Sequence, residues 1–433
     1  MTIKKILIVF FVPLALTFVE NKIKACSMYK ITVDGNTMVG CNHDAWLTTP
    51  KIWFENAKQQ NEYGTVFTGA REVSPTRTTP QSGMNTVGLV FSRLTSYYPE
   101  QNNPFSNRLR ITSEANYLSE ILHKCATVKE VKKHIEQYDH SFFLNDVFIY
   151  IDSLGDYLIV EPYKLIEGNN PNYVLSNFCP SITDINQARK IERYRNGEHF
   201  LKTHQAMASV EFCTALSDTM SVCRSRNGDG TLITSIFDTK AKKVNLYFYH
   251  NYDDLVQFSL SEELSKGDQC INLPEIFPAN EEFQTLVNFK TPSNSVVLRI
   301  LLLLIAGLLA LNTFTFILSL FWKNKFSLGL RKTVAVISIF NVMLIAYIFV
   351  LLTNKSIFYF DVPYKHYSSN LISAFSYTPF ILLAVFIPIL IHTRSQLKSF
   401  QMRFFKVAMV LNSALYVVLV LGFGYWGLFN FWN

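Results

Sequence analysis

The pattern of apolar and polar positions divides the chain into three parts. A short apolar run at residues 6–19 comes first, and a part of mixed polarity extends from there to about residue 290. Four long apolar stretches follow, at residues 300–322, 333–353, 371–392 and 407–429. Each stretch is close to the ~20 residues that span a bilayer, so we expect a membrane domain with four transmembrane helices at 296–433.

The N-terminal run is typical of a secretory signal peptide. Lys4 and Lys5 precede it, and a short polar stretch ending in Ala25 follows it. The run itself is too short to be a comfortable membrane span. We therefore predict a signal peptide at residues 1–25 and export of the part that follows.

Basic residues between the apolar stretches predict the orientation in the membrane. The connections after the first and third stretches are rich in Lys and Arg, which the positive-inside rule places in the cytoplasm; they contain Lys323, Lys325, Arg331, Lys332, Arg394, Lys398, Arg403 and Lys406. Residues 26–290 should then lie on the extracytoplasmic side. The prediction is a multi-pass membrane protein whose partners are the lipid bilayer and, through the spans, a second copy in a homo-oligomer.

The net charge of +7 does not indicate a nucleic-acid partner. Residues 296–433 contain eleven basic residues and one acidic residue, so the part before them has a net charge of about −3. The basic excess belongs to the membrane-spanning part, and we expect no nucleic acid to bind.

The pattern of strand-like and helical segments in residues 26–290 predicts an α+β domain. Three pairs of strand-like segments are joined by turn signals, the first around Asp34-Gly35-Asn36; they lie at 27–33 with 37–41, 147–152 with 157–161, and 232–238 with 244–250. Helical patterns occur between them at 113–125, 128–138 and 185–203. Hairpins alternating with helices favour antiparallel sheets covered by helices.

Cleavage after Ala25 would make Cys26 the N-terminal residue, with a thiol and a free α-amine on one residue. The reference pKa values are about 7.7–8.0 for the amine and about 8.5 for the thiol, so the amine can accept the thiol proton near neutral pH. Such a nucleophile also needs a carboxylate near the amine and donors for the oxyanion. Asp44, on the return strand of the first hairpin, can come back beside Cys26.

Five short motifs resemble one enzyme family in their order along the chain. They are Cys26-Ser27, Gly40-Cys41-Asn42-His43-Asp44, residues 83–89 (Gly-Met-Asn-Thr-Val-Gly-Leu), residues 152–155 leading to Glu161, and Leu175-Ser176-Asn177. Together they resemble the linear amide C–N hydrolases, the group with choloylglycine hydrolases, penicillin V acylases, acid ceramidase-like enzymes and acyltransferase relatives. The resemblance covers about residues 26–250 and implies the N-terminal-nucleophile hydrolase fold, a four-layer αββα sandwich, working without cofactor or metal.

The resemblance also implies roles for individual residues. Cys26 would be the nucleophile, Asp44 the carboxylate near the amine and Asn177 an oxyanion donor. Choloylglycine hydrolases have arginine where this chain has Cys41, so the cation near the nucleophile either comes from elsewhere, with Arg193 and Arg224 as the candidates, or is missing. Thr95 appears where those enzymes place a second oxyanion asparagine, and its hydroxyl or backbone N–H could donate.

Other interpretations of these residues stay open. Cys26 could be a lipidation site, Asp44 a helix or turn cap, Asn177 a turn residue, and the two arginines ordinary surface or ion-paired residues. His43 lacks a second His or Cys at zinc-like spacing, so a metal site is not expected. Seven cysteines occur, and six would remain for disulfides if Cys26 is a free thiol, with no preferred pairing.

The expected activity is hydrolysis of a carbon–nitrogen bond in a small N-acyl amide through a Cys26 thioester. Two alternatives remain: acyl transfer from the same acyl-enzyme to another amine, and a non-catalytic, membrane-anchored sensor or accessory domain. The four apolar stretches contain no Asp, Glu or Lys, so an ion or proton pathway through them is not expected.

Overall fold

A computed structural model describes residues 26–74, 76–222, 230–321, 328–359, 362, 374–396 and 403–430. They form two units: the described part of Lys22–Val287 is one, and that of Asn288–Asn433 is the other. The expected signal peptide lies outside the described residues, as do Cys223 and Arg224.

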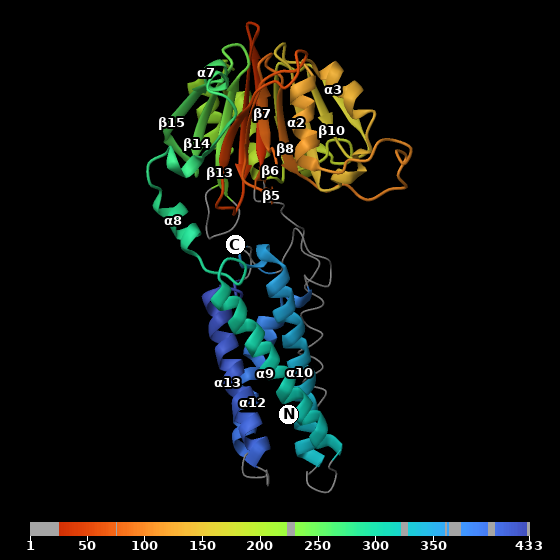
Figure 1. The fold of residues 1–433 in the computed structure, drawn as a ribbon, viewed down its shortest axis with the longest axis vertical. Coiled ribbons are helices and arrows are strands. Elements are labelled where there is room, and N and C mark those ends of the chain that lie inside the picture. The colour runs from red at the N-terminus through yellow and green to blue at the C-terminus, as the bar shows by residue number, and fades with distance from the viewer. Residues whose placement is uncertain are drawn as a thin grey trace. The chain divides into compact units, whose positions relative to one another are not determined.

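The first unit contains a six-stranded antiparallel sheet in the order β12-β1-β2-β13-β14-β15 (Figure 1). Its strands are β1 (Ser27–Val33), β2 (Asn36–Asp44), β12 (Asn172–Leu175), β13 (Thr231–Asp238), β14 (Lys243–Phe248) and β15 (Asn251–Ser259). The predicted first hairpin is confirmed, with Val33 opposite Asn36. Asp34 and Gly35 both have positive φ, as the two central residues of a tight hairpin turn require.

An eight-stranded sheet faces it, in the order β11-β10-β9-β8-β7-β4-β3-β16, and each pair of neighbours is antiparallel. Its strands are β3 (Lys51–Glu55), β4 (Thr65–Gly69), β7 (Ser82–Asn85), β8 (Val90–Thr95), β9 (Asp146–Ile151), β10 (Tyr157–Val160), β11 (Leu165–Gly168) and β16 (Gln269–Asn272). A two-stranded ribbon pairs β5 (Glu72–Ser74) with β6 (Arg77–Thr78). The two other predicted hairpins, β9–β10 and β13–β14, are confirmed.

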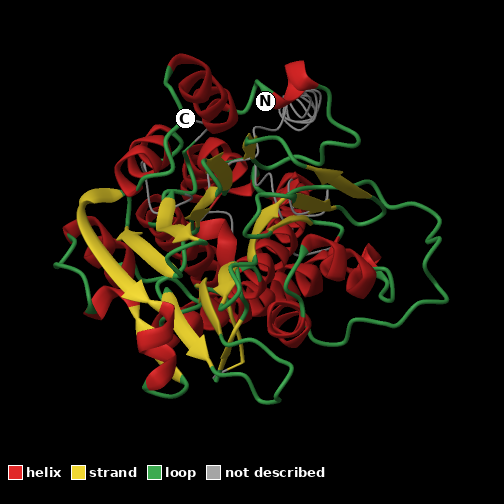
Figure 2. Ribbon diagram, turned by 90° about the horizontal axis from the view of Figure 1, so that it is seen from above, coloured by secondary structure: helices red, strands yellow, loops and turns green. Residues whose placement is uncertain are grey.

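Helices cover the outer faces of both sheets, so the unit has a helix–sheet–sheet–helix order. Figure 2 shows the strands and helices from above. Side chains of α2 (Glu114–Lys124) and α3 (Val128–Ile135) pack on the eight-stranded sheet, and those of α6 (Val210–Thr219), with α5 (Glu192–Thr203), pack on the six-stranded one. The inner faces meet directly, because Thr68 Oγ1 of β4 lies 3.2 Å from Ser235 Oγ of β13. The α+β prediction with antiparallel sheets is therefore confirmed.

The remaining described helices of this unit are short. They are η2 (His140–Phe143), α4 (Ile185–Ala188), α7 (Leu260–Ser265), η3 (Leu273–Glu275) and α8 (Glu281–Asn288), whose last residue begins the second unit. The prediction of one helix over 185–203 is wrong, because the segment forms α4 and α5 with an extended residue, Ile191, between them. This break redirects the chain so that Arg193 and Gly197 of α5 face the protein interior.

The second unit contains three helices long and apolar enough to cross a membrane, among the residues that the structure describes. They are α9 (Val296–Phe321), α10 (Leu328–Thr353) and α13 (Arg403–Tyr425), and η5 (Lys355–Phe358) follows α10. These three correspond to the first, second and fourth predicted spans, and they indicate a multi-pass membrane protein.

The prediction of four spans is wrong for the described residues. The third stretch, expected at 371–392, forms α12 (Thr378–Gln396), and its apolar part is only Thr378–Ile391. Proline favours the first turn of a helix, which suits the start of α12 next to Pro379. At 1.5 Å per residue this apolar part is about 21 Å long, shorter than the roughly 30 Å hydrocarbon core. Pro388 also lies inside the helix, where proline removes a backbone hydrogen bond.

Within the second unit, α9, α10 and α13 meet around one apolar cluster that includes Phe316, Val334 and Met409. This cluster joins the end of α9 to the beginnings of α10 and α13, so the basic residues at the two beginnings lie at one end of the bundle: Arg331, Lys332, Arg403 and Lys406. Buried polar groups link α10 to α13, because Asn341 Nδ2 donates to Asn412 Oδ1 at 2.8 Å and Tyr416 Oη to Asn341 Oδ1 at 2.6 Å.

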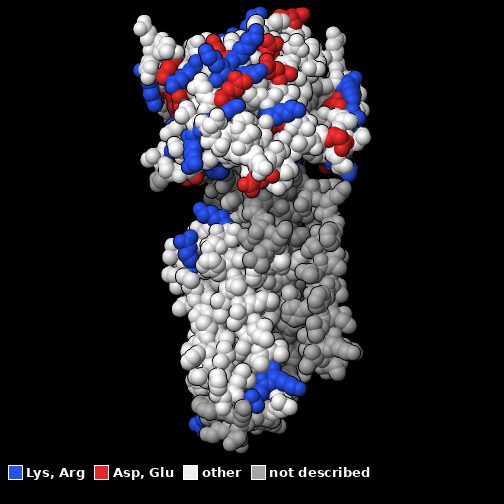
Figure 3. Space-filling model, turned by 90° about the vertical axis from the view of Figure 1, so that its right-hand side faces the viewer, with Lys and Arg blue, Asp and Glu red and all other residues white. Residues whose placement is uncertain are grey.

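Charged side chains are distributed differently on the two units (Figure 3). On the visible face of the first unit Lys, Arg, Asp and Glu are interspersed, whereas the described helices of the second expose a mostly uncharged surface. Large apolar side chains such as Leu303, Phe314, Ile339 and Leu421 are exposed on these helices. Exposed apolar surface of this extent fits a lipid environment.

Candidate active site

Cys26 lies directly before β1, at the end of the six-stranded sheet, and is 4% exposed. Its carbonyl oxygen accepts a hydrogen bond from Ser176 Oγ at 3.2 Å. Ser176 follows β12, which pairs with β1 on the side away from β2. Cys26 therefore lies between the ends of β12 and β2. The sequence did not predict its contact with Ser176.

Asp44 ends β2, the other neighbour of β1, and its carboxylate is satisfied by two distant segments. Asp44 Oδ1 accepts a hydrogen bond from Thr231 Oγ1 of β13 at 2.8 Å, and Oδ2 forms an ion pair with Arg193 Nη1 of α5. The Arg193 and Asp44 side chains are 5% and 1% exposed. The structure thus brings Asp44 and Arg193 together as a buried ion pair, whereas a helix or turn cap would bind nearby backbone N–H groups.

Cys41 cannot supply the positive charge that the resemblance places at its position. It is fully buried on β2, and burial raises the pKa of its thiol to about 12, so the thiol stays neutral. Of the two arginines considered as replacements, Arg193 supplies a cation beside Asp44, and Arg224 lies outside the described residues.

Asn177 is 1% exposed and lies next to Thr95, the other predicted oxyanion residue. Asn177 Nδ2 donates to the carbonyl oxygen of Thr95 at 2.7 Å, and Ser176 Oγ donates to Asn177 Oδ1 at 3.4 Å. The bond to Thr95 connects the strand end after β12 to β8 of the facing sheet, so it is a tertiary contact and not a local turn. It uses one N–H of the Asn177 amide and leaves the second for another acceptor.

His43 is a residue of this region that sequence reasoning considered only as a metal ligand. It lies on β2 between Asn42 and Asp44, and it is 1% exposed. The strand alternation was the signal that could have placed it on the same face as Cys41. Among the described residues no group of three His, Cys, Asp or Glu side chains could hold a metal ion.

None of the six cysteines that the structure describes forms a disulfide. Cys213 of α6 is buried, and Cys223 lies outside the described residues. Cys179 Sγ lies 3.2 Å from Ser96 Oγ, close to the Asn177 segment.

Comparison with known proteins shows a similarity in fold. No protein-family model and no curated protein matches the sequence. The chain is similar in structure to linear amide hydrolases. A variant of conjugated bile acid hydrolase from Clostridium perfringens is 16% identical with a TM-score of 0.44, over 57% of this chain and 96% of that one. Penicillin V acylase from Agrobacterium tumefaciens is 16% identical with a TM-score of 0.43, over 57% and 91%. A Caenorhabditis elegans orthologue of N-acylethanolamine-hydrolysing acid amidase is 13% identical with a TM-score of 0.35, over 49% and 92%.

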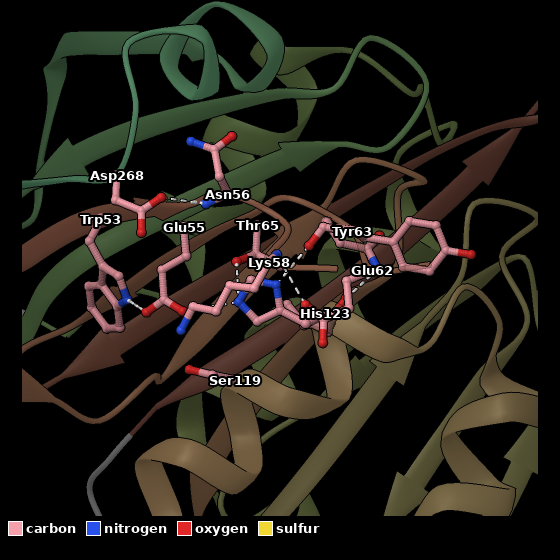
Figure 4. Close-up of polar contacts among 12 residues, drawn as sticks. Trp53, Glu55, Asn56, Lys58, Glu62, Tyr63, Thr65, Ser119, His123 and Asp268 are labelled. Carbon is pink, nitrogen blue, oxygen red and sulfur yellow. Dashed lines mark hydrogen bonds and ion pairs between the residues drawn. The ribbon is translucent and has the colours of Figure 1, made fainter. Parts of the chain in front are cut away.

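A second polar cluster lies at the edge of the eight-stranded sheet (Figure 4). Glu55 accepts hydrogen bonds from Trp53 Nε1 at 3.0 Å and Arg77 Nη1 at 2.9 Å, and its second oxygen lies 3.0 Å from His123 Nε2. Burial alone would raise the pKa of Glu55, but His123 and Arg77 together lower it. Glu55 and Arg77 also line a surface pocket of about 370 Å³ with Lys51, Lys58 and Asp268. No residue named by the sequence motifs lines this pocket.

Proposed function

We propose that the chain is an exported hydrolase of linear amides that uses Cys26 as its N-terminal nucleophile. The observation that carries the proposal is the buried ion pair of Asp44 and Arg193 at the end of the strand that pairs with β1. Burying two charges is unfavourable unless they are paired and hydrogen-bonded, and structural stability seldom requires such a pair. Its place near the start of β1 fits a carboxylate that orients the new α-amine of Cys26.

The reaction begins after cleavage between Ala25 and Cys26. The α-amine takes the thiol proton, the sulfur adds to the acyl carbon, and the carbonyl electrons move to oxygen. The free N–H of Asn177 is available to stabilise this oxyanion. The ammonium group then protonates the leaving nitrogen as the C–N bond breaks, giving an amine and a thioester. Water attacks the thioester, with the α-amine as base, and releases the carboxylic acid and the Cys26 thiol.

The membrane helices favour the interpretation that the substrate partitions into a bilayer. An enzyme tethered by α9, α10 and α13 meets such substrates at a high local concentration, so we propose N-acyl amides with long acyl chains as the preferred class. The basic residues at the beginnings of α10 and α13 support, through the positive-inside rule, an extracytoplasmic position for the hydrolase unit.

The test is the full chain, extracted in detergent, assayed by release of free amine from a long-chain and a short aromatic N-acyl amide. N-terminal sequencing of the same preparation should begin at Cys26, and the Cys26→Ala variant should release no amine above background. A Ser217→Ala variant, changed on α6 outside the proposed machinery, serves as the control for expression and folding. Amidase activity in a preparation that begins at another residue, or in Cys26→Ala, would refute the mechanism. A diacylglyceryl group on Cys26 would favour the non-catalytic alternative.

A further inference from the structure

The imidazole of His43 is buried and takes no part in the amide hydrolysis proposed for Cys26. It is 1% exposed, and neither ring nitrogen has a hydrogen-bond partner among the described residues. Burial lowers the pKa of His43 to about 3, so the ring is neutral in the physiological range. A neutral imidazole has one donor and one acceptor nitrogen, and leaving both unpaired in a protein interior is unfavourable.

The strand register places His43 next to the nucleophile. Ser27 of β1 is opposite Asn42 of β2, so one further residue along the ladder brings Cys26 opposite His43. Pairs alternate from the two-residue turn at Asp34-Gly35, which makes this a non-hydrogen-bonded pair, the kind with the closer side chains. The Cβ atoms of such a pair are about 4.5–5.5 Å apart.

His43 and Cys26 also share a face of the sheet. Asn42 points to the helical layer, where its Nδ2 donates to the carbonyl oxygen of Ser217 in α6 at 2.8 Å. His43 is the next residue, so its side chain points the opposite way, toward the eight-stranded sheet. Cross-strand neighbours lie on one face, and the Cys26 thiol therefore points to the same side as the imidazole.

We propose that His43 is a further catalytic residue, which donates a ring N–H to the oxyanion formed when Cys26 adds to the acyl carbonyl. The inference rests on the proposed amidase function and deepens it. Asn177 has one N–H left after its bond to Thr95, whereas oxyanion sites usually combine two or more donors. A neutral imidazole can act in this way without giving up its proton. His43 keeps its proton throughout: the S–C bond forms, the C–N bond breaks, and the leaving nitrogen receives its proton from the α-ammonium group.

The test compares two variants of the full chain in detergent. His43→Met is similar in volume and has no N–H, and His43→Gln retains an N–H donor. We expect kcat of His43→Met to fall about 100- to 1,000-fold, the usual loss for one oxyanion donor, with KM within about threefold of the wild type. The kcat of His43→Gln should be at least about tenfold higher than that of His43→Met. The thermal midpoint of His43→Met should equal or exceed that of the wild type, because two unpaired polar atoms are removed from the interior.

Alkylation of Cys26 by iodoacetamide supplies the second measurement, because it consumes the thiolate and forms no oxyanion. Its rate should be the same in His43→Met and the wild type. Equal fall of kcat and alkylation rate would overturn the proposal, since His43 would then act on the thiol. Wild-type kcat in His43→Met would also overturn it and leave the amidase function intact. A wild-type chain that begins at Cys26, reacts with iodoacetamide and hydrolyses no amide would refute both proposals together.

Discussion

Replacing Arg193 should destabilise the first unit strongly, because the Asp44 carboxylate would stay buried without its ion-pair partner. The two side chains are 1% and 5% exposed, and Asp44 keeps only the hydrogen bond from Thr231 once Arg193 is removed. Breaking a buried ion pair in this way costs about 3–5 kcal/mol. For a unit of this size the thermal midpoint shifts by about 2–4 °C per kcal/mol, so Arg193→Met should lower it by about 6–20 °C.

The double variant Asp44→Leu with Arg193→Met tests the reasoning. Replacing a whole buried pair by apolar residues is often neutral or stabilising, so the midpoint of the double variant should lie well above that of each single variant. Arg189→Met is a matched control: Arg189 pairs with Glu198 at the surface, where its side chain is 42% exposed, and such a pair contributes about 0–1 kcal/mol.

Thermal unfolding of the full chain in detergent, followed by near-ultraviolet circular dichroism, measures the wild type and all four variants. An equal loss of stability in Arg193→Met and Arg189→Met would contradict this prediction. Losses of the two single variants that simply add in the double variant would contradict it as well. The stable double variant should nevertheless release no amine from an N-acyl amide, because it lacks the carboxylate that orients the α-amine.

Three further predictions follow from particular residues. Burial lowers the pKa of Lys30 from its ordinary value of 10.5 to about 8, so the unfolded chain binds more protons than the folded one between these values. The free energy of unfolding should therefore rise from pH 8 to 10.5 in the wild type and should not show this rise in Lys30→Met, measured by urea titration. A Cβ at Gly40 would lie 2.0 Å from the Tyr29 ring, so Gly40→Ala should cost about 1–3 kcal/mol or more and lower amide hydrolysis with it. Asn341→Leu removes the bond to Asn412 and should destabilise the helical unit by about 1–2 kcal/mol, measured by unfolding in mixed micelles.

Local sequence signals predicted the part of the site that depends on one hairpin. The Asp34-Gly35 turn fixes the register of β1 and β2, and this register alone brings the end of β2 back to Cys26. The largely apolar runs of β9, β10, β13 and β14 were equally visible, because these strands are buried on both faces.

The rest of the site depends on contacts between distant segments. Arg193 reaches Asp44 across 149 residues and only because the chain is extended at Ile191, a break that the continuous helical pattern conceals. Asn177 donates to the carbonyl oxygen of Thr95 across the two sheets, and the sequence around neither residue indicated this hydrogen bond. The error at the third span has a related origin: composition over 371–392 was apolar enough, but hydropathy does not determine where a helix begins.

Consecutive side chains of β2 point to opposite faces of the sheet and therefore have different roles. Asn42 and Asp44 face the helical layer, where α6 and α5 supply a carbonyl oxygen and a guanidinium group. Cys41 and His43 face the other sheet, on the side to which the Cys26 thiol points. The ion pair of the proposed site thus lies on the opposite face of β2 from His43, whose imidazole is kept neutral by burial. Shifting the register by one residue would exchange the two faces, so the two-residue turn at Asp34-Gly35 is as necessary to the proposed chemistry as the residues that carry it.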